Sequence, residues 1–198
     1  MDSTIELRVA TPADAAAIAA IYAPIIRDTV TSFEIVEVSA GEMRRRLDTT
    51  LALHPWLVAD ATGTVLGYAY ATRHRSRAAY NWSVDVSVYL GDQARRRGLG
   101  RALYVALLDL LAAQGYASAF AGITLPNDAS VGLHRSLGFA PVGVYRAVGW
   151  KHGAWRDVQW WQRRLADDAP PSPPVPLPRV DDSAVARALA AGQATLPR

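Results

Sequence analysis

The sequence predicts a mixed α/β domain in which helices flank a single central sheet. Its 198 residues are enough for one such domain with a hydrophobic core. Apolar residues recur with the strand period of two in some segments and with the helical period of 3.6 in others. A glycine-rich segment, residues 93–103, separates an alternating apolar run from an apolar helical face, which places it at a strand-to-helix junction.

The first half of the chain supplies a strand, two helices and a hairpin. Residues 5–9 alternate like a half-buried strand, and Thr11 followed by Pro12 is typical of a helix start. Ser39 and Glu42 form a capping box that opens a second helix, which is expected to end near His54. Two strands, residues 56–59 and 65–70, then flank a hairpin loop.

The second half alternates strands with helices and ends in a tail. After a basic loop at residues 73–79, the pattern predicts strands over 82–90, 118–124, 141–148 and 155–164, and helices over 99–114 and 129–137. From residue 167 prolines dominate, so we expect a domain over residues 1–166 and a flexible proline-rich tail over 167–198. Within that tail, residues 182–191 could form a weak helix.

Composition excludes several kinds of chemistry and partner. The chain has no cysteine, which excludes disulfides, thiolate metal sites and a cysteine nucleophile. The histidines show no metal-ligand spacing, so no metal is expected. No apolar run could span a bilayer and the N-terminus lacks a signal pattern, which favours the cytoplasm and no membrane partner. The net charge of +3 comes without a clear basic patch, so no nucleic-acid partner is expected.

The glycine-rich junction has the features of a phosphate site. Gly98 and Gly100 lack a Cβ, so their backbone can approach a ligand closely, and arginines surround them. The helix that follows would point its unpaired N–H groups at a phosphate or pyrophosphate. Neither the three-glycine dinucleotide fingerprint nor the GK[ST] ending of a P-loop is present. The alternative is an ordinary tight turn with solvated arginines.

Six separate segments together resemble one family. They are Pro55-Trp56-Leu57-Val58-Ala59, residues 79–84, Arg97-Gly98-Leu99-Gly100, residues 125–131, Leu133-His134 and residues 151–158. With the spacing Arg95-x-x-Gly98-x-Gly100, they resemble the GCN5-related N-acetyltransferase (GNAT) family, and in particular its phosphinothricin N-acetyltransferase branch, over residues 5–165. The resemblance implies a splayed sheet that holds acetyl-CoA, transfer of the acetyl group to the α-amine of a small amino acid, and a homodimer.

The same resemblance assigns the residues that would hold acetyl-CoA. Backbone groups of Val88, Tyr89 and Leu90 would hold the pantetheine arm, although these residues could instead only fill the sheet. The pyrophosphate would be wrapped by Arg96, Arg97, Gly98, Leu99, Gly100 and Arg101, and Asn127 would lie near the thioester.

Two residues are candidates for proton transfer. Asp85 is the only carboxylate within the apolar central strand, and an amine nucleophile must lose a proton, so Asp85 is the expected base. The related branch usually has Glu here, and Asp is shorter by one methylene; the alternative is a structural Asp. His134 resembles the branch's histidine and could protonate the departing thiolate, or it could simply be packed and hydrogen-bonded.

Side chains near the central strand are expected to bind the substrate. Arg75, Arg77 and Tyr80 could hold a phosphinate, sulfone or carboxylate, while Phe33 and Trp82 could shape the pocket. Ser87 resembles a family Thr near the substrate, and the alternative is an ordinary strand hydroxyl. The alternative for both arginines is solvation, and Trp82 is more simply a core residue, as are Trp155, Trp160 and Trp161. Two other functions stay open: a CoA-binding regulatory module without catalysis, and an N-acetyltransferase of peptides or proteins.

Overall fold

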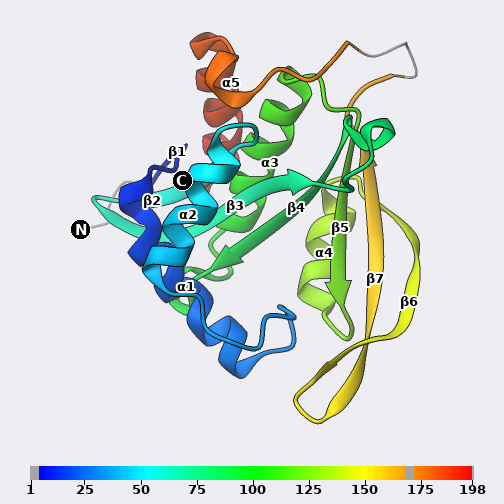
Figure 1. Cartoon of the computed structure of the whole chain (residues 1–198). Coiled ribbons are helices and arrows are strands. Elements are labelled where there is room, and N and C mark those ends of the chain that lie inside the picture. The colour runs from blue at the N-terminus through cyan, green and yellow to red at the C-terminus, as the bar shows by residue number, and fades with distance from the viewer. Residues whose placement is uncertain (1–4, 168–171, 198) are drawn as a thin grey trace.

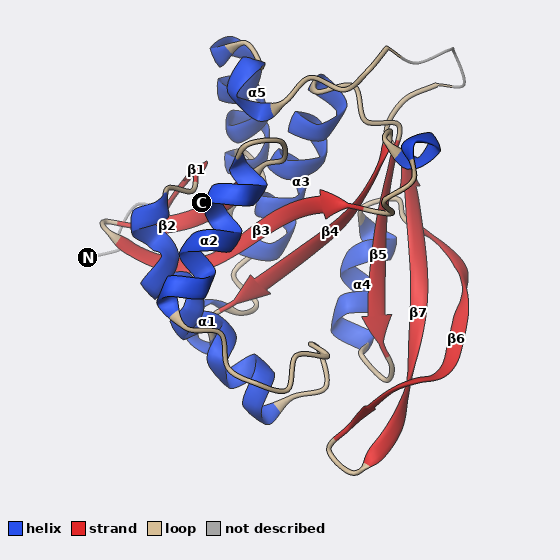
Figure 2. Cartoon of the chain, viewed as in Figure 1, coloured by secondary structure: helices blue, strands red, loops and turns tan. Residues whose placement is uncertain are grey.

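A seven-stranded sheet forms the centre of the protein (Figures 1 and 2). The computed structural model describes residues 5–167 and 172–197. The spatial order of the strands is β1-β2-β3-β4-β5-β7-β6, and among the described strands only β4 and β5 pair in parallel. The strands are β1 (Ile5–Val9), β2 (Trp56–Ala61), β3 (Thr64–Arg73), β4 (Ser83–Leu90), β5 (Ser118–Thr124), β6 (Ala140–Lys151) and β7 (Ala154–Arg164). The expected fold class, a mixed sheet flanked by helices, is confirmed.

Helices cover both faces of this sheet. They are α1 (Ala15–Asp28), α2 (Ala40–Leu51), α3 (Leu99–Ala113), α4 (Asp128–Ser136) and α5 (Asp182–Gln193). One core cluster joins α1 and α2 to Trp56 and Tyr68 of the sheet, and a second joins α3 to the opposite face. The expected cap of α2 is present, because the Ser39 hydroxyl accepts the Glu42 N–H at 3.2 Å. None of the described helices is both long and apolar enough to cross a membrane.

The sheet splits between β4 and β5. These strands pair only through residues 83–85 of β4 and 118–120 of β5. Beyond Asp85 and Phe120 they diverge, as Figure 1 shows, while β4 stays paired with β3 as far as Leu90. In the described part of the chain, residues 86–90 therefore have no neighbouring strand on the β5 side, and their outward backbone groups can serve an extended ligand.

The last helix of the chain packs against the core, whereas the sequence predicted a flexible tail over these residues. Helix α5 packs along α3, with Ala188 buried and Val185, Leu189 and Leu196 against the same core cluster (Figure 1). Gly192 allows this approach, because a Cβ there would lie 2.8 Å from Ala106 Cβ and closer still to the Ala102 carbonyl oxygen. The side chain of Gln193 also bonds the β1 backbone: it donates to Ile5 O at 2.5 Å and accepts from Leu7 N at 3.0 Å. The boundary at residue 166 stays a prediction.

Candidate active site

An open cleft of about 980 Å³ lies at the end of β4, beyond the residues that pair with β5. Its walls come from the end of β4, the loop before α3, the start of α4, and the end of α1 with the residues after it. Among the residues expected to bind acetyl-CoA, those lining the cleft are Val88, Tyr89, Leu90, Arg96, Gly98, Leu99, Gly100, Arg101 and Asn127. The exception is Arg97, which is exposed and is not part of this lining. The cleft therefore brings together segments that are far apart in the sequence, from Ile25 to Leu133.

The loop before α3 has the backbone of an anion site. Gly98 is the N-cap of α3 with φ of +78°, and Arg96 also has a positive φ of +61°. The first helical hydrogen bond is Ala102 N–H to Gly98 O at 3.0 Å, so the N–H groups before it lack helical acceptors. These groups and the helix dipole meet the arginines at the cleft, which suits a diphosphate. Arg95 was not among the predicted binders, yet it also lines the cleft, 2.9 Å from Asp92.

A second helix begins at the same cleft. Asn127 is the N-cap of α4, and its Oδ1 accepts the Ser130 N–H at 3.1 Å. This cap fixes Asn127 opposite the end of β4, because Asn127, Ser130 and Leu133 line the cleft together with Val88 and Leu90. Asn127 therefore lines the cleft, and its place near the thioester stays a prediction.

Asp85 lies at the vertex of the split. It is paired with Phe120 at the last parallel position, and its side chain is 29% exposed. Its Oδ1 accepts a hydrogen bond from His74 Nδ1 at 2.6 Å. Burial raises the pKa of the Asp85 carboxyl, while the His74 bond and the charge of Arg75 oppose that rise. A carboxylate with a raised pKa is suited to accept a proton.

His74 is the residue that the sequence-based reasoning missed. Strand β3 was expected to end at residue 70, but it continues to Arg73 and pairs with β4, so that Thr72 lies opposite Asp85. Side chains alternate along a strand, and His74 therefore follows Thr72 onto the same face as Asp85. The alternation of Tyr68, Tyr70, Thr72 and His74 was the signal in the sequence that could have indicated this.

Rings and an arginine surround this pair. The His74 ring stacks on Phe120 at 4.3 Å between centroids, and it contacts Tyr80 at 5.8 Å and Trp160 at 6.0 Å. The Arg75 guanidinium lies 5.7 Å from the Trp160 ring centroid. Two predicted substrate residues, Arg75 and Tyr80, are thus brought to Asp85. Arg77, the third, is exposed at the start of a short 3₁₀ turn.

Phe33 and Ser87 lie in different surroundings. Phe33, in the segment between α1 and α2, packs against Gly149 of β6, where a Cβ would lie 2.6 Å from two of its ring atoms. Nearby, Lys151 Nζ donates to Ser32 O at 2.7 Å, which ties the same segment to the β6–β7 hairpin. Ser87 is half-buried on β4, opposite Tyr70 of β3. The two residues therefore lie in different parts of the structure: Ser87 is two residues along β4 from Asp85, whereas Phe33 lies against β6.

The tryptophans divide between core and surface. Trp161 is buried and Trp160 and Trp82 are half-buried, but Trp155 is 62% exposed. The expectation that Trp155 belongs to the core is therefore wrong. It stands on the β6–β7 hairpin against Trp150, with 5.4 Å between ring centroids.

His134 is packed rather than open to the cleft. Its Nδ1 is 2.7 Å from Ser130 O, its Nε2 is 3.2 Å from the Tyr104 hydroxyl, and the ring contacts Phe139. The residue is 3% exposed, and burial lowers its pKa, so the neutral form is favoured. Because both ring nitrogens are already engaged, the structure favours the packed alternative over an acid for the thiolate.

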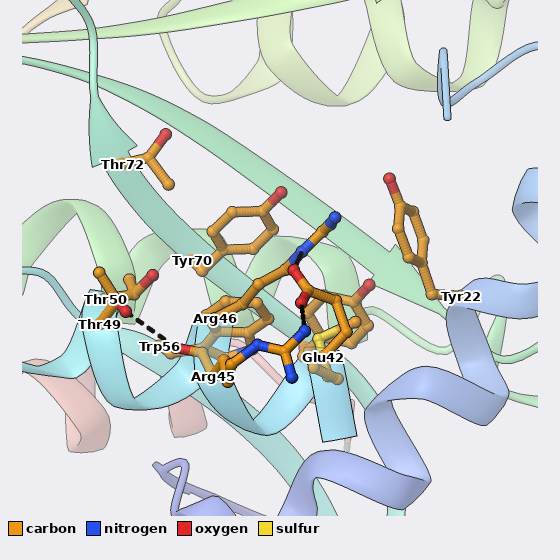
Figure 3. A pocket seen from close by; sticks show the side chains of 11 residues that line it. Tyr22, Glu42, Arg45, Arg46, Thr49, Thr50, Trp56, Tyr70 and Thr72 are labelled. Atoms are coloured by element: carbon orange, nitrogen blue, oxygen red, sulfur yellow. Dashed lines mark hydrogen bonds and ion pairs between the residues drawn. The ribbon is translucent and has the colours of Figure 1, made fainter. Parts of the chain in front are cut away.

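A smaller cavity of about 480 Å³ lies under α2, on the same face of the sheet as Asp85 (Figure 3). Tyr22, Tyr70 and Thr72 line it, and Thr72 connects it to the vertex. Its Arg46 is neutralised by Glu34 at 2.7 Å and Glu42 at 3.0 Å. Among the described residues, no ion pair joins Arg75 or Arg77 to a carboxylate within 4.0 Å. Positive charge for an anionic substrate is thus available beside Asp85 rather than in this cavity.

The split sheet and the anion loop at its opening define a class of protein: the N-acyltransferases that seat an acyl-coenzyme A between two diverging strands. The sequence model described as "Acetyltransferase (GNAT) domain" matches residues 7–160. The chain belongs to this GNAT family of acetyltransferases, and the expected membership is confirmed. Among the described residues, no group of three acidic or histidine side chains is arranged to hold a metal ion.

Two curated relatives and one solved structure illustrate the similarity. The chain is 42% identical over 176 residues to phosphinothricin N-acetyltransferase of Streptomyces viridochromogenes, covering 89% of this chain and 96% of that protein. It is 38% identical to the L-methionine sulfoximine/L-methionine sulfone acetyltransferase of Pseudomonas aeruginosa, covering 80% and 94%. A phosphinothricin acetyltransferase from Sinorhizobium meliloti, crystallised with acetyl-CoA, is 38% identical with a TM-score of 0.82, covering 85% and 94%. The expectation of an acetyl-CoA-dependent N-acetyltransferase is thereby confirmed.

Proposed function

We propose that this enzyme acetylates the α-amine of a small anionic amino acid, with phosphinothricin, methionine sulfoximine and methionine sulfone as the leading substrates. The observation that carries the proposal is the placement of Asp85 and Arg75 at the vertex of the split sheet, beside the cleft that suits acetyl-CoA. The names of the relatives add support, because they are acetyltransferases of phosphinothricin and of methionine sulfoximine or sulfone.

Acetyl-CoA would bind along the cleft as an extended co-substrate. The outward backbone groups of Val88, Tyr89 and Leu90 would bond its pantetheine arm in place of the missing neighbouring strand. The diphosphate would lie on the N-terminus of α3, where Gly98 supplies the positive φ of the turn and Gly100 adds no side chain. This orientation would point the thioester along β4 toward Asp85.

The reaction needs a neutral amine, and Asp85 would provide it. An α-ammonium group cannot attack a carbonyl, so its proton must be accepted first. The raised pKa of Asp85 brings its carboxyl closer to the operating pH than an exposed carboxyl would be. The amine then attacks the thioester directly while both substrates are bound, and the products are the acetylated amino acid and free CoA thiol.

The cation near Asp85 would select an anionic side chain. Arg75 packs on Trp160, and its Nη1 donates to the His74 carbonyl oxygen at 2.9 Å. Its remaining N–H groups would make charge-assisted hydrogen bonds to a phosphinate or carboxylate. Tyr80 contacts His74 and is 41% exposed, so its hydroxyl could bond the same substrate. An amino acid without such an anionic or strongly polar side chain would lose these contacts.

Release of CoA thiol across a panel of free amino acids tests the proposal. Phosphinothricin, methionine sulfoximine and methionine sulfone should give the highest kcat/KM, and leucine should give little. An Asp85→Asn variant should lower turnover by roughly 10²–10⁴-fold while it still binds acetyl-CoA. Thiol release with peptides but with no free amino acid would contradict the proposed substrate class, and no release with any amine would favour a CoA-binding regulatory module.

We also propose a homodimer, as the family resemblance implies. Apolar side chains are exposed along β6 and the β6–β7 hairpin, including Val142, Val148, Trp150 and Trp155. A second copy of the chain would cover this surface. Sedimentation at micromolar concentration would test it, and a monomer at all concentrations would contradict it. A cytoplasmic location stays a prediction.

A further inference from the structure

A half-buried histidine, His74, and the expected base, Asp85, form a pair at the vertex of the split sheet. We propose that His74 is a positioning residue for Asp85: through Nδ1 it holds one carboxylate oxygen and keeps the carboxylate ionised, so that the other oxygen can take the proton of the amine. This inference rests on the proposed function. Asp85 is one methylene shorter than the Glu that is usual in the related branch. A carboxylate that His74 holds in one orientation can still act as the base despite this shorter side chain.

The geometry of the pair carries the inference. The Nδ1–Oδ1 distance of 2.6 Å is short, as expected for a hydrogen bond to an ionised group. An ionised carboxylate has no hydrogen to donate, so Nδ1 must carry the hydrogen of this bond. The His74 side chain is 11% exposed and that of Asp85 is 29% exposed. Asp85 is thus the member of the pair with more access to a substrate, and His74 is the member behind it.

The His74 ring is held by packing on several sides. Phe120 stacks on it from β5, Trp160 meets it from β7, and Tyr80 meets it from the loop before β4. Phe120 is also the parallel neighbour of Asp85, so the same residue places the ring beside the carboxylate. A group fixed in this way loses little further freedom when the reaction occurs, which is what a supporting residue of an active site requires.

The charges around the pair set the sign of the expected effect. Burial favours the neutral carboxyl and raises the pKa of Asp85, whereas the His74 bond and the Arg75 charge favour the ionised form. Tyr80 is the other titratable group in contact with His74, and Phe120 and Trp160 bring no charge. Removing the His74 donor leaves burial opposed only by Arg75, so the pKa of Asp85 should rise further.

The proton balance of the reaction is simple. The ammonium group gives one proton to the free oxygen of Asp85 and becomes a neutral amine. The amine nitrogen forms a bond to the thioester carbon, the carbon–sulfur bond breaks, and the second amine proton leaves as the amide forms. The departing sulfur takes up one proton to give the CoA thiol, and Asp85 returns the other to solvent. His74 keeps its Nδ1 hydrogen bond throughout and is not consumed.

Two variants of His74 separate its donor from its ring. His74→Phe keeps an aromatic ring against Phe120 but has no donor, whereas His74→Asn loses the ring but keeps an amide N–H near the Nδ1 position. We expect His74→Phe to lower kcat/KM at pH 7 by roughly 10–100-fold, the value of a hydrogen bond to a charged group. Its acidic limb in the pH profile should move to higher pH. His74→Asn should lie closer to the wild type on both measures.

Further measurements distinguish a role through Asp85 from a merely structural one. Acetyl-CoA affinity by calorimetry should be unchanged in His74→Phe. His54→Gln, at a histidine that lines neither cavity and bonds the Tyr116 hydroxyl, should leave turnover and pH profile as they are. In an Asp85→Asn background, adding His74→Phe should have no further effect. A ¹³C NMR titration of the Asp85 carboxyl should show a higher pKa in His74→Phe than in the wild type, without any need for turnover.

Several results would overturn the inference. It fails if His74→Phe keeps kcat/KM within threefold with an unmoved acidic limb, or if His74→Phe still lowers activity when Asp85 is already Asn. It also fails if the carboxyl titration shows no rise. A wild type that acetylates no amine, combined with the expected carboxyl titration, would remove the proposed function and keep the His74–Asp85 relationship.

Discussion

Replacing Gly192 with alanine should loosen the last helix from the domain. A methyl group at this position would lie 2.8 Å from Ala106 Cβ and 2.9 Å from Leu7 Cδ1, and closer still to the Ala102 carbonyl oxygen. Ordinary contacts of a Cβ begin near 3.4 Å. The backbone of α3 cannot yield as a flexible side chain can, so α5 itself must move outward.

The size of this effect follows from the cost of overfilling a packed interface. Substitutions that overfill a packed core typically lower the free energy of unfolding by about 1–3 kcal/mol. For a chain of this length each kcal/mol shifts the Tm by roughly 2–4 °C, so the expected decrease is roughly 2–12 °C. The helical preference of alanine over glycine, worth roughly 0.5–1 kcal/mol, works in the opposite direction and reduces the loss.

Thermal unfolding followed by circular dichroism, with a matched glycine as control, would measure the change. Gly132 lies within α4, and a Cβ there meets nothing within 4 Å. Gly132→Ala should therefore raise the Tm slightly, because only the helical preference acts. If Gly192→Ala raised the Tm as much as Gly132→Ala, the close packing of α5 on α3 would be refuted.

Three other predictions concern the substrate wall and the response to acid. Gly149→Ala should displace Phe33, because a Cβ at this position would clash with the Phe33 ring. We expect a higher KM for the amino acid and an unchanged Kd for acetyl-CoA. An unchanged KM would show that Phe33 is not part of the substrate site. Arg75→Gln should lower kcat/KM for phosphinothricin by roughly 10–100-fold, and an equal loss with leucine would argue against anion recognition. The hydrogen bond from Arg8 lowers the pKa of Asp14 below its ordinary 3.8. The stability that this ion pair gives the fold is therefore present above pH 3.8 and is lost as the pH falls through the lower pKa of Asp14 in the folded state. Urea titrations of Asp14→Asn should therefore show a deficit of roughly 1–3 kcal/mol at pH 7 that shrinks below about pH 4, and a constant deficit down to pH 2 would contradict the assignment.

The features that the sequence predicted well depend on local patterns. Gly98 and Gly100 between an apolar strand and an apolar helix indicate an anion loop without knowledge of the rest of the fold. Asp85 stands out because a single carboxylate in an apolar strand needs a partner or a role. The start of α2 at Ser39 was predictable for the same reason, since a capping box involves residues only three apart.

The features that were missed depend on contacts between distant segments. His74 meets Asp85 only because β3 extends to Arg73 and pairs with β4 in one particular register. The surroundings of His134 come from Tyr104, thirty residues earlier on another helix. The prolines before α5 indicate extended chain, but residues 168–171 lie outside the described part and Leu177–Arg179 form a short 3₁₀ turn. The prolines also conceal the apolar face of the helix that follows them.

The contact of Gln193 with β1 has a consequence for solubility. β1 is an edge strand, so its N–H and C=O groups on the side away from β2 make no hydrogen bonds to another strand of the described sheet. Such groups can pair with a strand of another molecule. The Gln193 amide occupies two of these groups, at Ile5 and Leu7, much as a residue of an eighth strand would. A chain shortened before Gln193 would uncover this border, and we expect it to self-associate through β1 and precipitate more readily than the full-length protein.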